Sequence, residues 1–407
     1  MIERKEYLEK LMAWKDKAVI KVVTGIRRAG KSTLLEQFRA RLQESGVSKE
    51  QIVSVNFEEL EYEALQDRHE LYAYLKGKLR RGQMTYIFLD EVQKVEGFEQ
   101  VVDSLYVKEN VDLYITGSNS WLLSGELATL LSGRYVEIGV LPFSFAEFYE
   151  SRGGGDRDRL FAEYMADGGF PYLAALNGSR ESVDTYLEGI YNTVILKDIE
   201  ERQRRRGEEP NRRRVTDLAL LQNISKFLAS SVGSPVSVKK IADFITSSGR
   251  KVSQNTVDDY VEALVQAFVF YRAERYDVEG KQLLVQNARF YIVDLGLRRY
   301  LLPRRNYDLG FSLENVVYLE LKRRGFSVCV GKVGAAEVDF VARKGDEITY
   351  FQVSASLTDE ATFAREIAPL RKIGDDHRKK ILTLDRFTIG NYDGIEVVHA
   401  VDWLLEG

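Results

Sequence analysis

The chain has 407 residues, 44% of them hydrophobic and 29% charged, which excludes a disordered or fibrous protein and leaves room for roughly two to four domains. Lysine and arginine total 58 against 62 aspartate and glutamate, and the net charge of −4 argues against polyanion binding by the whole surface. One cysteine excludes an intramolecular disulfide, and three scattered histidines leave no ligand set for zinc. Since the sequence has neither a signal-peptide core nor an apolar run of ~18 residues, we expect a cytoplasmic protein with no membrane span.

The first 150 residues alternate short apolar runs with amphipathic stretches, a pattern typical of strands separated by helices. Such an alternation predicts a parallel sheet with crossover helices. The predicted strands are residues 19–24, 52–57, 86–91 and 112–118. A glycine-rich joint, SRGGGD at 151–156, follows this part of the chain.

The rest of the chain has a different organisation. A helical segment runs to about residue 205, and the arginine-dense stretch 202–214 is predicted to be an exposed loop. Residues 215–290 show three helical patterns followed by two β-type segments. Residues 211–310 carry 16 basic and 10 acidic side chains, so any polyanion site is expected in this block, whose net charge is +6. A helix and three strands follow from about residue 310.

A phosphate-binding pattern directly follows the first predicted strand. Residues 25–32 read GIRRAGKS and match G-x-x-x-x-G-K-[ST], with a predicted helix after them, the context that the pattern requires. Backbone N–H groups of such a loop wrap phosphates, the lysine neutralises the β- and γ-phosphates, and the serine hydroxyl ligates Mg²⁺. The residues predicted to bind ATP are Gly25, Ile26, Arg27, Arg28, Ala29, Gly30, Lys31, Ser32 and Thr33.

The third predicted strand supplies the complementary acidic pair. YIFLDE at 86–91 has four apolar residues before Asp90 and Glu91. Asp90 is predicted to hold Mg²⁺ together with Ser32, and Glu91 to polarise the attacking water. ATP and Mg²⁺ are therefore the predicted cofactors.

Three further residues fit a nucleotide site less specifically. Asn119, after the fourth strand, either holds the attacking water near the γ-phosphate or is a turn residue. Asn56 ends the second strand and either bonds Glu91, switching it on or off, or caps the strand. Arg134 lies between a predicted helix and the strand YVEIGV, where it either reaches a neighbouring subunit's γ-phosphate or forms a surface salt bridge.

The chain resembles the bacterial and archaeal AAA-type (AAA+) ATPases in which a P-loop core is joined to a C-terminal domain of uncharacterised function. The resemblance rests on strings spread over nearly all 407 residues: TGIRRAGKSTLL, YIFLDEVQ, TGSNSWLLSGELATLLSGRYVEIGVLPFSFAEF, GGFP, YNTVILKDIEER, NARFYIVDLGLR, LENVVYLEL and EVDFVARKGDEITYFQVS. It implies an α/β protein with an ATPase core at 1–150 and a helical lid with the arginine-rich loop at 151–210. A winged helix at 211–305 and a small nuclease-like domain at 306–407 complete the expected architecture. By the same resemblance we expect a homo-oligomer of six subunits.

The pattern of 215–290 also predicts a winged helix by itself, because three helices precede a two-stranded wing. Ser253 is predicted to cap its third helix, whose middle carries the phosphate-repelling residues Asp258, Asp259 and Glu262. Sequence-nonspecific DNA binding through backbone contacts is therefore expected, with protein packing as the alternative role of the module. The basic residues predicted to make these contacts are Arg250, Lys251, Arg272, Arg275 and Lys281.

The last block is similar to the PD-(D/E)xK nucleases, with Glu314 on a helix and Asp339 on a strand. At the remaining two positions of that pattern, where a carboxylate and a lysine are needed, this chain has Gln352 and Ser354. Without that charged ligand and that cation, metal-assisted cleavage is not expected, unless Lys332 or Lys344 reaches the site from a neighbouring strand.

The predicted function is Mg²⁺-dependent ATP hydrolysis coupled to binding, remodelling or translocation of duplex or branched DNA. Two alternatives stay open: a nucleotide-gated regulatory ATPase with a protein partner, and an ATP-powered nuclease.

Overall fold

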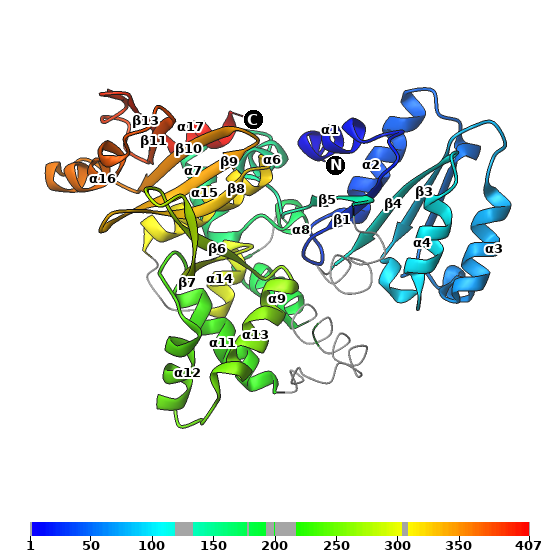
Figure 1. Cartoon of the computed structure of the whole chain (residues 1–407), viewed down its shortest axis with the longest axis horizontal. Coiled ribbons are helices and arrows are strands. Elements are labelled where there is room, and N and C mark those ends of the chain that lie inside the picture. The colour runs from blue at the N-terminus through cyan, green and yellow to red at the C-terminus, as the bar shows by residue number, and fades with distance from the viewer. Residues whose placement is uncertain are drawn as a thin grey trace. The chain divides into compact units, whose positions relative to one another are not determined.

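The computed structural model describes residues 2–118, 133–176, 179–192, 199, 217–302 and 308–406 (Figure 1). The chain forms two compact units. The first consists of residues 1–141 with the short segment 266–268, and the second of residues 142–265 and 269–407. Within the described ranges, no helix has the length and apolar character needed to cross a lipid bilayer.

The first unit is built on a five-stranded sheet in the order β2-β3-β4-β1-β5, in which every pairing is parallel. Its strands are β1 (Ile20–Thr24), β2 (Ile52–Asn56), β3 (Thr85–Asp90), β4 (Val111–Gly117) and β5 (Tyr135–Gly139). Its α-helices are α1 (Lys5–Ala13), α2 (Lys31–Glu44), α3 (Arg68–Lys78) and α4 (Phe98–Tyr106). Short 3-10 helices, η1 (Lys49–Gln51), η2 (Leu60–Gln66) and η3 (Val92–Lys94), complete the connections. The parallel sheet predicted from the apolar runs is confirmed.

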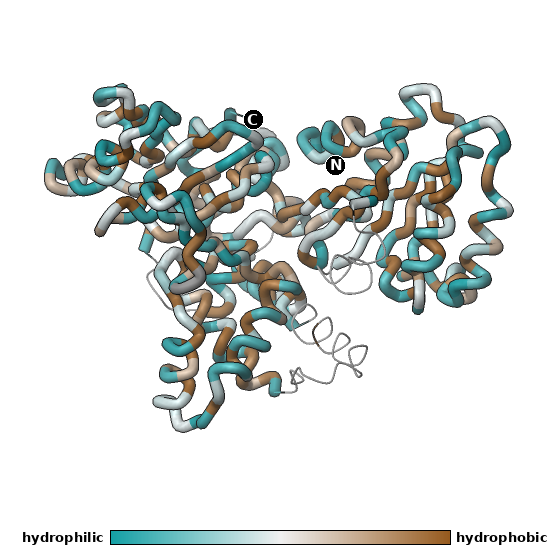
Figure 2. The backbone as a smooth tube through the Cα atoms, viewed as in Figure 1, coloured by the Kyte–Doolittle hydropathy of each residue, from teal (hydrophilic) through white to brown (hydrophobic). Residues whose placement is uncertain are grey.

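Strands β1 and β3 are buried along their whole length, which is why they read as continuous apolar runs rather than alternating ones. Figure 2 shows this concentration of apolar residues along the strands. The core of the unit joins strand residues such as Val22, Leu89 and Ile115 to Phe98 and Leu105 of α4.

The second unit contains a mixed eight-stranded sheet in the order β12-β13-β11-β10-β9-β8-β6-β7. Its strands are β6 (Phe270–Asp277), β7 (Gln282–Ile292), β8 (Ser327–Val333), β9 (Ala336–Lys344), β10 (Glu347–Ser354), β11 (Arg378–Thr383), β12 (Gly390–Tyr392) and β13 (Ile395–His399). Helices precede, interrupt and follow these strands: α6 (Phe145–Ser151), α7 (Arg157–Asp167), α8 (Pro171–Ala175), α9 (Arg180–Tyr191), α11 (Leu218–Ser230), α12 (Val238–Ser247), α13 (Gln254–Gln266), α14 (Leu295–Leu301), α15 (Leu309–Arg323), α16 (Glu360–Lys372) and α17 (Ala400–Leu405).

The structure divides the chain differently from the predicted boundaries. The three helices and the hairpin of 215–290 lie where the pattern predicts them, but β6 of the hairpin pairs with β8 in parallel, from Arg275 opposite Val330 onward. The strands before and after the boundary expected at 305/306 therefore belong to one continuous sheet.

The first compact unit ends at Leu141, and the next helix, α6, belongs to the second. Phe145 and Phe148 of α6 pack against Phe161 and Tyr164 of α7, with ring centroids 5.0–5.7 Å apart. The glycine-rich joint at 151–156 is therefore a turn between two packed helices and not a linker between domains.

Candidate nucleotide-binding site

The loop between β1 and α2 has the backbone geometry that its two glycines permit. Gly25 has φ of +139° and Gly30, at the amino end of α2, has φ of +93°. A Cβ atom on Gly25 would lie 2.1 Å from the carbonyl oxygen of Val140, which follows β5. Only glycine therefore fits at this point of the loop.

Lys31, the first residue of α2, is buried within this region. Its Nζ donates to the carbonyl oxygens of Gly25 at 3.0 Å and Ile26 at 3.2 Å. The same Nζ lies 4.0 Å from a carboxylate oxygen of Glu91. The lysine charge thus sits between the loop and the acidic pair, as expected for a phosphate-binding lysine.

Asp90 ends β3 next to the loop serine. Burial raises the pKa of this carboxyl group, while hydrogen bonds from Ser32 and Thr116 act in the opposite direction. In the described part of the chain, no group of three or more His, Cys, Asp or Glu is placed to hold a metal ion. Mg²⁺ at nucleotide sites is bound by one or two protein ligands plus phosphate oxygens. Ser32 and Asp90 fit this mode, in which Mg²⁺ neutralises the phosphate charge.

Glu91 adopts a backbone conformation that is uncommon for a residue with a side chain, with φ of +53°. Its N–H donates to Thr116 Oγ1 at 2.9 Å. Its carboxylate accepts hydrogen bonds from Gln93 and, at 3.2 Å, from the Ser118 hydroxyl. Both hydrogen bonds reach the same oxygen, Oε2, and the other carboxylate oxygen lies 4.0 Å from the Lys31 Nζ, which together fix the direction of the group.

The side chain of Asn56 is directed to the turn after β2 and not to Glu91. It donates to Glu59 at 3.2 Å and accepts from the Glu58 N–H at 3.0 Å. Of the two interpretations of Asn56, this structure has the strand-end cap. Gln93 and Ser118, for which the sequence predicted no role, are the residues that bond Glu91.

The site assembles because of strand order. Strands β3, β4 and β1 are neighbours and parallel, so their carboxyl ends lie at the same edge of the sheet. This edge brings together the predicted loop 25–33 with Asp90 and Glu91. Thr116 and Ser118 join from the end of β4. Asn119 lies outside the described residues.

Arg134 lies at the other end of the strands, where β1 begins. Its carbonyl oxygen accepts from the N–H of Ile20 at the start of β1, whereas the loop follows the end of that strand. At about 3.3 Å per residue, the five residues from Ile20 to Gly25 span about 16 Å. The Arg134 side chain is partly exposed, bonds Asp103 at 2.6 Å and lies over the Tyr106 ring. The structure thus does not bring Arg134 to the loop of its own chain.

Arg4 supports the loop from its other side and carries no recognisable sequence signal. This buried guanidinium donates to the carbonyl oxygens of Ala29 at 3.0 Å and Leu141 at 2.8 Å, and lies 4.8 Å from the Tyr7 ring centroid. Arg4 therefore ties the loop to the last residue of the first unit.

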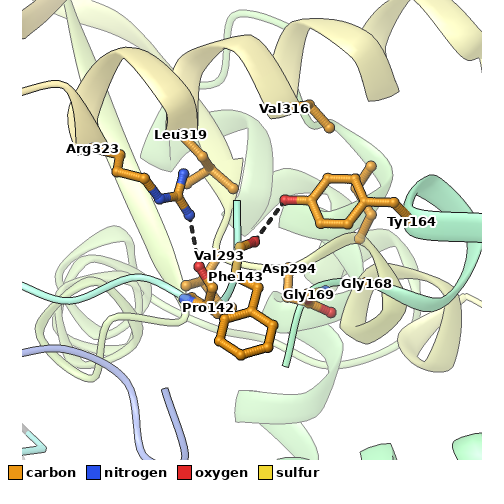
Figure 3. Close-up of a pocket in the computed structure, with 11 residues that line it drawn as sticks. Pro142, Phe143, Tyr164, Gly168, Gly169, Val293, Asp294, Val316, Leu319 and Arg323 are labelled. Carbon is orange, nitrogen blue, oxygen red and sulfur yellow. Dashed lines mark hydrogen bonds between the residues drawn. The ribbon is translucent and has the colours of Figure 1, made fainter. Parts of the chain in front are cut away.

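A second arginine bonds the carbonyl oxygen of Pro142, the residue after Leu141. Arg323 of α15 donates to the Pro142 oxygen at 2.6 Å, and the Tyr164 hydroxyl donates to the Phe143 oxygen at 2.9 Å (Figure 3). The adjoining cavity has a volume of about 10 Å³, room for no more than one water molecule. These residues are therefore closely packed and leave no room for a ligand.

Asp294, a buried residue that lines the same small cavity, contacts Gly168 and Gly169. It accepts the Gly169 N–H at 2.6 Å and the Leu297 N–H at 3.0 Å, and burial raises its pKa to about 6. A Cβ atom on Gly168 would lie 2.1 Å from an Asp294 oxygen. This contact gives a physical reason for two of the quoted strings. Gly168 of GGFP has no side chain, and the carboxylate of Asp294, in NARFYIVDLGLR, occupies the free space.

Gly168→Ala is expected to destabilise the second unit more than Gly153→Ala. Both glycines have positive φ, +84° and +76°, so both variants carry backbone strain, which is larger at Gly168 because its ψ of −174° lies in a region that is essentially restricted to glycine. Gly153 has open space at its Cβ position, whereas the Gly168 variant also clashes with Asp294 and loses about 1–3 kcal/mol more. Urea unfolding of the two variants measures the difference, and equal losses would contradict the close contact.

The predicted carboxylates of the second unit also meet, but around an arginine. Glu314 and Asp339 both bond Arg289, whereas Gln352 bonds Glu366 at 2.7 Å. Ser354 donates to the Ser356 carbonyl oxygen at 2.9 Å. The two lysines considered for this site point elsewhere: Lys332 pairs with Asp277 and Lys344 bonds the Arg324 carbonyl oxygen.

Comparison with known proteins places an AAA domain in the first part of the chain. Residues 17–149 match the family model of an AAA domain, and residues 158–308 match a domain of unknown function (DUF8612). A walker-type ATPase of Pyrococcus abyssi has a similar fold, with a TM-score of 0.51 and 17% identity over 74% of this chain and 96% of that one.

Two curated relatives extend over nearly the whole chain. The uncharacterized protein MJ1544 of Methanocaldococcus jannaschii is 29% identical over 94% of this chain and 85% of its own length. An uncharacterized protein of Haemophilus influenzae is 41% identical over 100% of this chain and 99% of its own. The chain therefore belongs to the same family as the Haemophilus influenzae protein, and its residues 17–149 form an AAA domain, as in AAA-type ATPases.

Proposed function

We propose that this protein is a Mg²⁺-dependent ATPase that couples ATP hydrolysis to the binding and remodelling or translocation of duplex or branched DNA. The observation that carries the ATPase part is the convergence of Lys31, Asp90 and Glu91 at one edge of the sheet. The loop and Lys31 hold the phosphates, Ser32 and Asp90 hold Mg²⁺, and Glu91 polarises the attacking water. Phosphate release by the wild type and by Lys31→Ala tests this part.

Coupling is proposed to run through the Leu141–Pro142 peptide. Arg4 holds the Leu141 oxygen and a loop carbonyl in the first unit, and Arg323 holds the Pro142 oxygen on α15 in the second. A change in the loop on ATP binding would therefore move Leu141 through Arg4. The next residue, Pro142, is held by Arg323 and would pass this change on to α15. Loss of this link in Arg323→Met would leave basal hydrolysis and remove its response to DNA.

DNA binding is proposed for the block of residues 211–310. Its net charge of +6 contrasts with the acidic balance of the whole chain. The Ser253 hydroxyl accepts from the Thr256 N–H at 3.2 Å, as predicted for the cap of α13, and leaves Gln254 and Asn255 exposed at the start of that helix. Acidic residues in the middle of α13 disfavour base reading, so phosphate contacts without sequence preference fit this surface.

Neutralising Lys251 and Lys281 together is expected to weaken DNA binding uniformly across sequences. Both lysines are exposed, and neither pairs with a described residue. Each lost phosphate contact lowers the slope of log affinity against log salt by about 0.9 on B-DNA. Fluorescence anisotropy over a salt series measures the slope. The control is Arg371→Gln in α16, which removes an ion pair to Asp393. An unchanged slope would remove these lysines from the interface and leave the arginine-rich stretch 202–214, outside the described residues, as the candidate.

A regulatory ATPase with a protein partner is the second candidate. One specific observation favours it: three of the five basic residues predicted to contact DNA are paired within the protein. Arg250 bonds Asp217, Arg272 lies 4.0 Å from Glu262, and Arg275 lies 2.5 Å from Glu337. The two functions separate in one assay, since DNA stimulates hydrolysis only in the first.

We further propose a homo-oligomer, with six subunits by family resemblance, in which Arg134 serves the neighbouring site. Its position at the amino edge of the sheet, about 16 Å along β1 from its own loop, supports action between subunits rather than within one.

A further inference from the structure

A single guanidinium group lies at the centre of three carboxylates in the second unit. Arg289 of β7 places Nη1 2.8 Å from Glu314 and 3.2 Å from Asp339, and Nη2 2.7 Å from Glu337. Glu314 comes from α15, and the two other acids from β9. The cluster therefore joins the hairpin that follows the three helices to a helix and a strand of the C-terminal part.

Three of the four members of this cluster are buried, so the charges of these three are poorly screened. Arg289, Glu314 and Asp339 are each no more than 8% exposed. The Tyr291 hydroxyl donates to Glu314 at 2.6 Å, and the Val353 N–H donates to Asp339 at 2.9 Å. Burial, with Asp339 nearby, raises the pKa of Glu314 to about 8 although Arg289 opposes the shift. Without a cation among them, these acids would lose both their charge balance and part of their hydrogen bonding.

Carboxylates that converge from a helix and a strand present the oxygen ligands that Mn²⁺ and Mg²⁺ prefer. Here a cation is already present, and it is tethered covalently and stays protonated at any accessible pH. Among the described residues, no three such acids stand close enough to hold an ion. This spacing is expected when a planar guanidinium, which is larger than a metal ion, separates them.

We propose that Arg289 is the resident cation of this cluster and keeps divalent metal out of a carboxylate site that would bind it once the guanidinium is removed. This inference goes beyond ATP hydrolysis and DNA binding. Besides the neutral Gln352 and Ser354, it gives a further reason to expect no metal-assisted cleavage by the second unit. Arg289 lies on a strand that the sequence pattern did not connect with this site.

Two variants of the full chain, Arg289→Met and Arg289→Lys, test the proposal without nucleotide. Wild type and Arg289→Lys should bind no Mn²⁺ at the cluster and show no change of Tm in millimolar Mn²⁺. Arg289→Met should melt several degrees lower and regain most of the loss when Mn²⁺ is added, with one additional Mn²⁺ bound per chain by electron paramagnetic resonance.

The double variant Arg289→Met/Asp339→Asn is the matched control, because it keeps any ion held at the ATP site and removes one ligand of the cluster. It should lose the extra Mn²⁺ and the recovery of Tm. A folded Arg289→Met that binds no extra Mn²⁺ would overturn the proposal, as would wild-type binding that Asp339→Asn abolishes. If neither Arg289→Met nor Arg289→Gln folds with or without Mn²⁺, a free cation does not replace the guanidinium and the proposal fails as well.

Discussion

Replacing Glu91 by glutamine is expected to leave ATP binding intact and to lower the rate of hydrolysis by about 10²- to 10⁴-fold. In the proposed site the loop and Lys31 hold the phosphates, and both are unchanged in this variant. Glutamine keeps the shape of the side chain and its hydrogen bonds to Gln93 and Ser118, but it removes the negative charge that polarises water. Titration with a fluorescent ATP analogue measures binding, and steady-state phosphate release measures turnover.

Two further variants make this result specific. Lys31→Ala should lose nucleotide affinity, because it removes the cation that faces the β- and γ-phosphates. Glu109→Gln, an exposed glutamate between α4 and β4, should retain full activity. Equal hydrolysis by wild type and Glu91→Gln would show that another group activates the water.

Arg134→Ala is expected to lower hydrolysis by about 10³- to 10⁵-fold when Arg134 supplies the transition-state charge at a neighbouring subunit. Because this arginine lies far from the loop of its own chain, the loss should be repaired between subunits. Mixing Arg134→Ala with Glu91→Gln creates interfaces that contain one intact Arg134 and one intact Glu91. Partial recovery of phosphate release in the mixture, with assembly checked by size-exclusion chromatography, is the expected result.

The matched control comes from the salt bridge that Arg134 forms in this structure. Asp103→Ala removes the partner at 2.6 Å and leaves the arginine in place. If Arg134 acts on the neighbouring nucleotide, Asp103→Ala stays active. If the arginine serves only that ion pair, Asp103→Ala loses as much activity as Arg134→Ala and the mixture does not recover.

Much of the first unit is predictable because its signals are local. A strand, a glycine-containing loop and a helix follow one another within residues 19–44, and the loop chemistry depends on that order alone. The acidic pair Asp90 and Glu91 is recognisable from the apolar run before it. Contacts that depend on distant segments are not: Arg4 reaches Leu141, 137 residues away in sequence, and no periodicity carries that information.

The second unit shows the same limit at the level of domains. A three-helix pattern followed by a hairpin is readable locally, but the parallel pairing of β6 with β8 depends on a strand some fifty residues further on. Likewise, the carboxylates Glu314 and Asp339 are readable as a pair, whereas their shared partner Arg289 belongs to the hairpin that appeared to be part of another domain. The sequence therefore pointed to the acids but not to the cation between them.

The rate of phosphate release by the full chain, measured with and without linear duplex and four-way-junction DNA, tests the proposed coupling most directly. Lys31→Ala supplies the background rate, and a salt series separates electrostatic binding from other effects. Our account predicts hydrolysis above that background, a clear increase with DNA, and loss of the increase at high salt. A rate that exceeds the Lys31→Ala background but does not change with any DNA would contradict the coupling and favour an ATPase that acts on a protein partner.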